Sequence, residues 1–436
     1  MPAILIPLLA LFLAGCITSP PQPREFTLIY SGNLDGELEP CGCSEAGNLG
    51  GIKRRVAMLD TLRRDHPDLI LVSSGGLIES EMPQDRIKAE FILRGLSEAR
   101  YDAIGLQWKD LAYGPDFLTR QPLPWVASNW RGDEFPKIRT IRRPGLRLAV
   151  FQWLDPKRDP ERAMAGPGRA ENDPSALLQA MEGAHRRGAV TVLGSTLPYA
   201  LWAKRPPFSL ESVDILIQRA RYEEYGEPKR LGDTWVLQPG SRGMRLGLAR
   251  FRIDPSQELT LVEHRVIPLP KAVGEAERLH DWYAAYNAAV KADYQRRVEL
   301  RRAMAQEQGP YLGEAGCKTC HPKEHARWLE TRHAQAFYTL QDVKKAFDPE
   351  CIACHTLGFE RPGGFIDPQL TADKMHVQCE NCHGPSRSHA ESGGATPTAH
   401  TDWPKARVCA QCHVHEHSPE FDLDRYWPRI AHGPAD

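Results

Sequence analysis

Short apolar runs alternate with amphipathic segments from residue 25 to about residue 268. Five runs rich in leucine, isoleucine and valine are typical of buried strands, and they cover 26–31, 68–73, 146–151, 189–193 and 213–217. Residues 52–64 and 87–99 repeat apolar side chains at the spacing of an amphipathic helix. Three later runs, at 234–237, 246–251 and 259–262, predict an antiparallel end to the domain. The alternation predicts an α/β fold with layered sheets.

Residues 274–308 have a different pattern, with abundant Ala, Glu, Arg, Leu and Lys and without proline. Their apolar side chains recur at helical spacing and form one stripe, which consists of Leu279, Trp282, Tyr283, Tyr286, Val290, Tyr294 and Val298. We expect one long helix that packs this aromatic stripe against a domain and ends before Gly309.

The last quarter of the chain carries one short motif four times. Each copy is Cys-x-x-Cys-His, and the copies are Cys317/Cys320/His321, Cys351/Cys354/His355, Cys379/Cys382/His383 and Cys409/Cys412/His413. Two thiols at this spacing can form thioethers with the vinyl groups of a haem, and the next histidine then lies under the iron as proximal ligand. Structural zinc is the alternative, but two Cys-x-x-Cys pairs already complete a tetrahedral zinc site, which needs no histidine after every second cysteine. The motifs predict four covalently attached haem c groups.

The region around these motifs is too short for a conventional hydrophobic core around each cofactor. Residues 310–436 hold all four motifs, so only about thirty residues are available to surround each haem. The porphyrins must then form the core, wrapped by short helices and loops. Close packing of cofactors suits multistep electron transfer, because the protein holds them in range and tunes their iron ligands. We expect a mainly α, cofactor-cored multihaem cytochrome c domain.

Histidine is concentrated in the same region. Twelve of the sixteen histidines lie from residue 321 onward, and four of these are the proximal candidates. The other eight are candidates for the distal side of an iron: His325, His333, His376, His389, His400, His415, His417 and His432. Imidazole on both faces keeps iron six-coordinate and favours electron transfer over substrate binding. Four irons need at most four distal ligands, so at least four of the eight have another role.

The first sixteen residues are typical of an export signal. An apolar run too short to span a bilayer ends in Leu-Ala-Gly-Cys16, which resembles a bacterial lipobox. In that interpretation residues 1–15 are removed, Cys16 is acylated, and residues 16–24 form an extended tether. An ordinary signal peptide with an incidental cysteine is the alternative. Because haem attachment to Cys-x-x-Cys-His occurs outside the bacterial cytoplasmic membrane, we expect an extracytoplasmic, lipid-anchored protein at the outer membrane, on its periplasmic or surface face.

Charge and hydropathy exclude some partners. The formal net charge is −1 at pH 7, and no basic stripe with interleaved aromatic residues is present, so nucleic-acid binding has no support. No internal apolar run approaches the length of a membrane span, so membrane contact is expected through the lipid anchor. The expected division is a signal peptide (1–15), a tether (16–24), an α/β domain (25–272), a linker helix (273–309) and a tetrahaem domain (310–436).

Cys41 and Cys43 lie one residue apart in a glycine-rich loop after the first predicted strand. Such a pair can bind a soft metal, cycle as a strained disulfide or capture a sulfur substrate. A structural pair of cysteines, oxidised or free and without chemistry, fits the sequence as well.

Four segments of the α/β region carry a family resemblance. They are residues 28–36 after the first strand, the Gly50-Gly51 helix start with its arginines, residues 101–105 with 113–114, and residues 213–217. In this order they resemble the metallophosphoesterase domain of the 5′-nucleotidase and UDP-sugar hydrolase family, which implies that fold. The family's metal-ligand positions have changed, and they are now Asn33, Asp35, Gly76, Trp108, Lys109, Asp110, Ser195, Ala220 and Tyr222. A two-metal hydrolase needs an almost complete ligand set, so we expect the fold without phosphoesterase activity.

Further segments carry a second resemblance across nearly all of residues 310–436. They are Tyr311 to His321, Trp328 to Ala336, Cys351 to Phe359, and Val377 to Pro385 followed by His389. They resemble the cytochrome c-554 family of tetrahaem cytochromes. The resemblance implies that His333 and His389 are the strongest distal ligands, with His432 next. It also implies that the haem on Cys351, Cys354 and His355 is five-coordinate.

The functional hypothesis combines these features. We expect a lipid-anchored, extracytoplasmic tetrahaem c-type cytochrome that relays electrons between redox partner proteins, which are other cytochromes or an oxidoreductase. The α/β domain then acts as a docking or substrate module. One alternative is an oxidoreductase that converts a small nitrogen or sulfur compound at an open-iron haem, with Cys41 and Cys43 holding the substrate. Another is a structural component of a redox complex at the outer surface.

Overall fold

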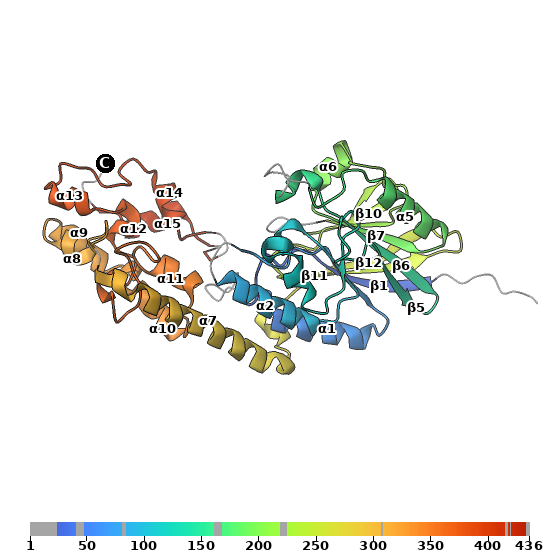
Figure 1. Ribbon diagram of the computed structural model, residues 1–436, viewed down its shortest axis with the longest axis horizontal. Helices are drawn as coiled ribbons and strands as arrows, with labels where there is room; N and C mark the ends of the chain where they lie inside the picture. Colours follow the sequence, from blue (N-terminus) through green and yellow to red (C-terminus); the bar gives the residue numbers. More distant parts are fainter. Residues whose placement is uncertain are drawn as a thin grey trace, which may run out of the picture.

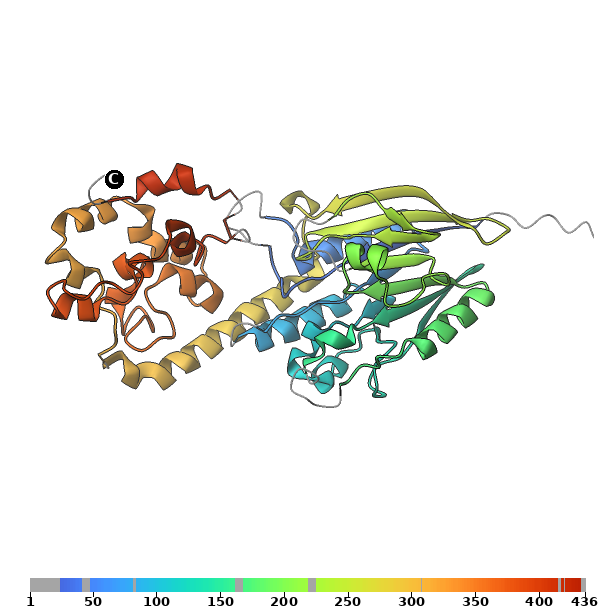
Figure 2. The same cartoon turned by 90° about the horizontal axis from the view of Figure 1, so that it is seen from above.

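The computed structural model describes residues 24–40, 48–80, 84–160, 168–218, 225–306, 308–414, 417–418 and 420–432. Figure 1 shows an α/β region with two sheets and, at the other end of the molecule, a helical region that carries the four Cys-x-x-Cys-His motifs. The long helix α7 (His280–Arg301) runs from one region to the other, as Figure 2 shows from above. The predicted sites that lie outside the described residues are Cys16, Cys41, Cys43, Ala220, Tyr222 and His415.

Two six-stranded sheets build the α/β region, with the orders β12-β11-β1-β2-β3-β4 and β5-β6-β7-β8-β10-β9. The strands are β1 (Arg24–Ser31), β2 (Ile70–Ser73), β3 (Ala103–Gly105), β4 (Trp125–Val126), β5 (Arg139–Arg143), β6 (Leu146–Trp153), β7 (Val190–Ser195), β8 (Ile215–Gln218), β9 (Lys229–Leu231), β10 (Thr234–Leu237), β11 (Arg245–Ile253) and β12 (Leu259–Pro268). The strands β1 to β4 are parallel in one sheet, and β6, β7, β8 and β10 are parallel in the other. The antiparallel pairs lie toward the edges of the sheets.

The two sheets face each other across an apolar layer, and helices cover their outer faces. Alternate residues of a strand point to opposite faces, so Leu28 and Tyr30 of β1 lie between the sheets while Ile29 lies under the helices. The helices α1 (Ile52–Asp65) and α2 (Asp85–Ser97) cover the first sheet, and α5 (Ser175–Arg186) and α6 (Tyr199–Lys204) cover the second. Three smaller elements are η1 (Trp108–Tyr113), α3 (Pro115–Thr119) and η2 (Pro156–Arg158). The predicted layered α/β fold is confirmed.

The end of the α/β region differs from the prediction. Residues 234–237 form β10, but this strand pairs in parallel with β8 and belongs to the second sheet. The chain then changes sheets near Gly240, which has a φ of 83°, and only β11 and β12 form the predicted antiparallel pair. Hydrophobic periodicity identifies a strand but not its partner, which explains the difference.

The helix α7 carries the predicted stripe and divides it between the two regions. Trp282 and Tyr286 pack on Phe91 of α2, and the indole N–H of Trp282 donates to the carbonyl oxygen of Phe91 over 2.9 Å. Farther along the helix, Tyr294 and Val298 join an apolar cluster of the helical region. The helix is shorter than the predicted stretch, because short 3₁₀ turns precede and follow it: η3 (Lys271–Val273), η4 (Glu277–Leu279) and η5 (Arg302–Gln306).

Short helices and turns make up the helical region. They are α8 (Glu314–Lys318), α9 (Pro322–Leu329), η6 (Arg332–Gln335), α10 (Ala336–Asp342), α11 (Pro349–His355), η7 (Ala372–Lys374), α12 (Cys379–His383), α13 (Arg387–Glu391), α14 (Lys405–Cys409), α15 (Leu423–Tyr426) and η8 (Trp427–Arg429). The helices α8, α13, α14 and α15 bury none of their own residues, and the apolar cluster around Phe337, Ile352 and Phe365 is small. Across the described residues, no helix is both long enough and apolar enough to cross a membrane.

Candidate haem sites

Each Cys-x-x-Cys-His motif forms a single helical turn. In the first and fourth motifs the backbone N–H of the histidine donates to the carbonyl oxygen of the first cysteine over 2.9 Å. The second motif ends α11, and the third forms α12. Residues i, i+3 and i+4 lie on one face of a helix, so each turn presents two thiols and one imidazole to the same side. No disulfide joins the eight cysteines of the motifs, and Cys320 is the exposed one among them. This arrangement matches the attachment of one haem per motif.

Three of the four proximal candidates face a second histidine. The ring centroids are 6.3 Å apart for His321 and His389, with an angle of 19° between the planes. They are 6.2 Å apart for His333 and His413, and 5.9 Å apart for His383 and His432. Metal–nitrogen bonds of about 2 Å place each imidazole centroid about 3 Å from a shared ion, so rings that ligate one iron lie about 6 Å apart. The separations fit axial ligation, and the three partners are the predicted His389, His333 and His432.

His355 has a different environment. Its Nδ1 lies 2.6 Å from the carbonyl oxygen of Ala336, a contact that orients the ring and leaves Nε2 as the ligating atom. In the described part of the chain no second imidazole faces His355 as in the other three motifs. Among the described residues, the imidazole of His355 is thus the one donor that this motif presents.

Four other histidines of the region have contacts of their own. Nε2 of His325 contacts a carboxylate oxygen of Glu314, and Nδ1 of His376 accepts a hydrogen bond from the backbone of Phe337. His400 stacks on Trp403 at a centroid distance of 3.7 Å. His417 is exposed and interacts with the carboxylate of Glu350. These roles agree with the expectation that at least half of the eight distal candidates are not ligands.

Burial favours the neutral form of three of the six facing histidines. Desolvation lowers the pKa of His333, and the nearby His413 and His355 lower it further. Burial also lowers the pKa of His383 and of His413. A neutral imidazole is the form that binds a metal, so these sites are electrostatically prepared for ligation.

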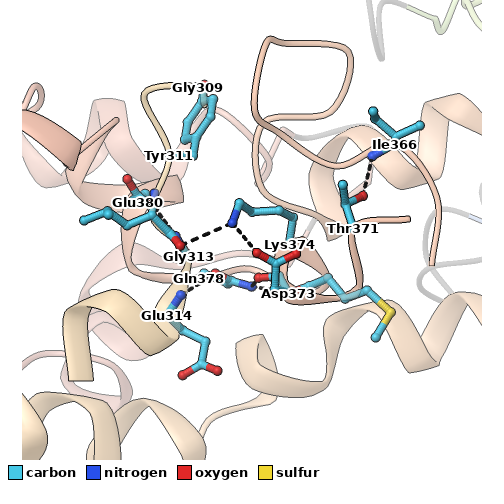
Figure 3. Close-up of polar contacts among 12 residues, drawn as sticks. Gly309, Tyr311, Gly313, Glu314, Ile366, Thr371, Asp373, Lys374, Gln378 and Glu380 are labelled. Atoms are coloured by element: carbon cyan, nitrogen blue, oxygen red, sulfur yellow. Dashed lines mark hydrogen bonds and ion pairs between the residues drawn. The ribbon is translucent and has the colours of Figure 1, made fainter. Parts of the chain in front are cut away.

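Polar side chains between the motifs brace them against one another, and Figure 3 shows part of this network. The carboxylate of Glu380, inside the third motif, accepts the backbone N–H groups of Leu312 and Gly313 over 2.9 and 2.8 Å. Gln378 accepts the N–H of Glu314 over 2.7 Å and donates to the carbonyl oxygen of Asp373. The chain that leads into the first motif is thus fixed by residues of the third.

Other contacts give the order of the motifs in space. The side chains of Cys317 and Cys379 are neighbours, and so are those of Cys354 and Cys412. The first motif therefore neighbours the third, and the second neighbours the fourth. The amide of Asn381 also donates to Thr356 over 2.9 Å and links the third motif to the end of the second. The roles of Glu380, Gln378 and Asn381 were not predicted, because the motif specifies only its cysteines and histidine and leaves these positions variable.

The positions that the resemblance assigns to metal ligands include an ion-paired cluster. The ammonium of Lys109 lies 2.7 Å from a carboxylate oxygen of Asp35 and 2.6 Å from one of Glu79. The side chain of Asn33 donates to Asp35. At Gly76, which has a φ of 73°, a Cβ atom would lie 2.7 Å from the side-chain oxygen of Gln107, so a longer side chain has no room. An ammonium occupies the position where a two-metal centre would need ligands.

Asp110 and Ser195 also have structural partners. Asp110 is fully buried and accepts backbone N–H groups from Gly76, Leu77 and Gln107 over 2.6–2.9 Å. Burial raises its pKa to about 6, despite these hydrogen bonds and the nearby Lys109. The hydroxyl oxygen of Ser195 accepts the N–H of Leu197. Among the described residues no group of three or more His, Cys, Asp or Glu side chains is arranged around a metal position. The residues present do not fit the metal centre of a phosphoesterase.

Comparisons with known proteins divide the chain in the same way. Residues 316–384 match the family described as Cytochrome c554 and c-prime. The cytochrome c-554 of Nitrosomonas europaea is 30% identical over 146 residues, a match that covers 25% of this chain and 60% of that protein. The chain thus spans less than two thirds of the length of this relative.

The α/β region resembles solved phosphoesterase structures. The 5′-nucleotidase precursor of Thermus thermophilus has a TM-score of 0.53 and 18% identity, and the match covers 62% of this chain and 59% of that one. The calcineurin-like phosphoesterase YfkN of Bacillus subtilis has a TM-score of 0.48 and 13% identity, and the match covers 62% of this chain and 98% of that one. Both predicted resemblances are confirmed: the C-terminal region is similar to cytochrome c-554, and the α/β region has the fold of the metallophosphoesterases.

Proposed function

We propose that this chain is a tetrahaem c-type cytochrome that relays electrons between redox partner proteins. The observation that carries the proposal is the set of three facing histidine pairs, with centroids 5.9–6.3 Å apart, each beside a Cys-x-x-Cys turn. When bound, haem iron between two imidazoles supplies a one-electron carrier with no open ligand position. The similarity to cytochrome c-554 supports covalent haem c in this region.

The chain's own residues have distinct tasks in this proposal. The cysteines of each motif would hold the porphyrin through thioethers, and the following histidine would ligate the iron. The distal ligands are His389 for the first motif, His432 for the third and His333 for the fourth. Contacts such as those of Glu380 and Asn381 keep neighbouring motifs close, which suits electron transfer between cofactors.

The stoichiometry of haem tests the proposal directly. Mass spectrometry of the mature protein should give the polypeptide plus four haem masses, and a pyridine haemochrome assay should give four haems per chain. Two or fewer haems, or stoichiometric zinc, would contradict it.

The same mass spectrum tests the proposed lipid anchor, because acylation at Cys16 adds the mass of its acyl chains. Fractionation should then place the protein at the outer membrane, as we propose from the Leu-Ala-Gly-Cys16 signal.

A second candidate function rests on the environment of His355. An iron with only this ligand has a free position that can bind a small nitrogen or sulfur compound, which would make the protein an oxidoreductase. A high-spin haem that binds nitric oxide or carbon monoxide and turns over hydroxylamine or a sulfur oxyanion would support this function. Four low-spin haems that bind neither gas would support electron transfer as the sole function.

The α/β domain serves as a docking or substrate module in either case. Its metallophosphoesterase fold carries the Lys109 cluster in place of the metal ligands, so hydrolysis is not part of the proposed function. Docking onto purified redox partners can be measured with the full chain, and a partner that exchanges electrons with the haems without binding the α/β domain would argue against this role.

A further inference from the structure

Two ion pairs join the α/β region to the helical region at one place. The ammonium of Lys88 on α2 lies 2.7 Å from a carboxylate oxygen of Glu350, and the ammonium of Lys345 lies 2.5 Å from a carboxylate oxygen of Glu39. Both lysines are largely shielded from water, with 13% and 16% of the side chain exposed. Partly buried pairs of this kind are screened less by salt than surface pairs. We call these four residues the junction clamp.

The junction clamp lies at the start of α11, the helix that carries the second motif. Asp348 caps this helix by accepting the N–H of Glu350 over 3.2 Å, and its carboxylate lies 3.5 Å from the ammonium of Lys345. Lys345 also donates to the side-chain oxygen of Asn287 on α7 over 3.1 Å. The helix with Cys351, Cys354 and His355 is thus held from α2, from α7 and from the loop that contains Glu39.

The charges of the clamp lie beside the point of haem attachment. Glu350 directly precedes Cys351 in the sequence, and Lys88 of the α/β region pairs with Glu350 over 2.7 Å. Farther out, the carboxylate of Glu37 pairs with Arg242 and interacts with Lys88, Glu350 and His417. Charges of the α/β region therefore reach the second motif through a partly buried junction.

We propose that Lys88 and Glu350 are positioning residues that set the reduction potential of the haem on the second motif. The α/β domain then tunes the haem of the motif that has no facing histidine among the described residues. The proposal rests on the proposed function, which assigns a haem to Cys351, Cys354 and His355. Reduction of a ferric iron by one electron lowers its charge by one, so a nearby cation favours the reduced form and a nearby anion favours the oxidised form.

Single substitutions in the full-length holoprotein test the proposal. Lys88→Met should lower the reduction potential of one haem, because it removes a positive charge. Glu350→Gln should raise the reduction potential of the same haem, because it removes a negative charge. The double variant should have a reduction potential near that of the wild type. The charge swap of Lys88→Glu with Glu350→Lys should restore an ion pair between the two positions. The readout is a spectroscopic redox titration that follows the four haems separately.

A matched control separates tuning from general stability. Arg143 on β5 pairs with Asp102 over 2.9 Å, and β5 lies at the end of the α/β region away from the helical region (Figure 1). Arg143→Met should leave all four potentials unchanged. Shifts of equal sign in the two single variants, or no shift in either, would overturn the proposal. Haem content reports separately on the proposed function: a chain without a haem on Cys351 and Cys354 would contradict that function. With the haem present, opposite shifts of one potential support the junction clamp whether that haem is high-spin or low-spin.

Discussion

The imidazole rings of His321 and His389 face each other with centroids 6.3 Å apart and planes 19° apart, although one follows the first haem motif and the other lies on α13 after the third. The pairing crosses from one motif to the chain segment of another. Each of the three facing histidine pairs therefore depends on residues that only the tertiary fold brings together, and a single substitution should affect one haem at a time.

Removing a distal histidine should change the spin state of one haem. We expect His389→Ala or His333→Ala to convert one low-spin haem to high-spin and to shift its potential upward, because the iron loses a strong-field ligand. Absorption and electron paramagnetic resonance spectra measure the change, and the haem content should stay constant. His417→Ala is the control for the spin state, since this residue follows His413 by only four positions and lies too close to its own motif to reach over that iron easily. An unchanged spectrum in both distal variants would contradict the ligand assignment.

Glu380→Ala should destabilise the helical region. The carboxylate is 3% exposed and accepts the N–H groups of Leu312, Gly313 and Ser386. Buried donors left without partners should cost roughly 2–4 kcal/mol of the free energy of unfolding. Thermal unfolding and haem retention measure the effect. Glu330→Ala, which alters a carboxylate that is 72% exposed, should change the free energy by less than about 0.5 kcal/mol. Equal effects of the two variants would show that the network of Glu380 is dispensable.

The full-length protein should hydrolyse no phosphoester. Lys109 occupies the space between Asp35 and Glu79 with an ammonium, which repels divalent cations. Assays with a nucleotide and a UDP-sugar in the presence of manganese or zinc should give only the background rate. Lys109→Met should also be inactive, because Gly76 and Ser195 supply no metal ligand, but it should lower stability by leaving two carboxylates without their cation. Robust metal-dependent turnover by the wild type would refute this expectation.

Asp110 should give the α/β region a specific pH dependence. Its pKa is raised from 3.8 to about 6, so between these values the folded state binds more protons than the unfolded state. The contribution of this group to stability is therefore present below about pH 4 and is lost as the pH rises through about 6, by up to about 3 kcal/mol. Denaturant unfolding of the wild type and of Asp110→Asn across pH 4–7 measures it. A constant difference between the two proteins would contradict the raised pKa.

Cys41 and Cys43 should respond to mild reductant, a prediction that rests on the sequence alone. A disulfide across one intervening residue is strained and therefore easily reduced. Alkylation with and without reductant, followed by peptide mapping, should show more labelling of both residues after reduction. Complete labelling without reductant, or no labelling under either condition, would favour a structural pair.

The sequence was informative wherever a local pattern determines structure. The apolar runs predicted β1, β2, β6, β7 and β8, and the Cys-x-x-Cys-His spacing predicted the helical turns that present thiols and imidazole to one side. It was also informative about which positions in the former metal site had changed, although only the structure showed that Lys109 bridges Asp35 and Glu79.

Contacts between distant segments were not predictable in the same way. The partner of β10 depends on where the chain changes sheets, which no period in the sequence records. The partner of His413 is His333, and spacing alone could not select it among eight candidates. Glu380 looked like a variable position between two cysteines, and its role comes from backbone N–H groups about seventy residues earlier in the chain.

The helix α7 has a consequence for how the protein matures. Its first half packs on α2 through Trp282, and its second half supplies Tyr294 and Val298 to the small apolar cluster of the helical region. A loss of order at one end of a continuous helix removes support at the other, so the two regions should unfold as one cooperative unit. The folding of the whole chain should then depend on the insertion of haem. Molecules that fail to acquire their cofactors should expose Tyr294 and Val298 to the proteases that remove misfolded proteins.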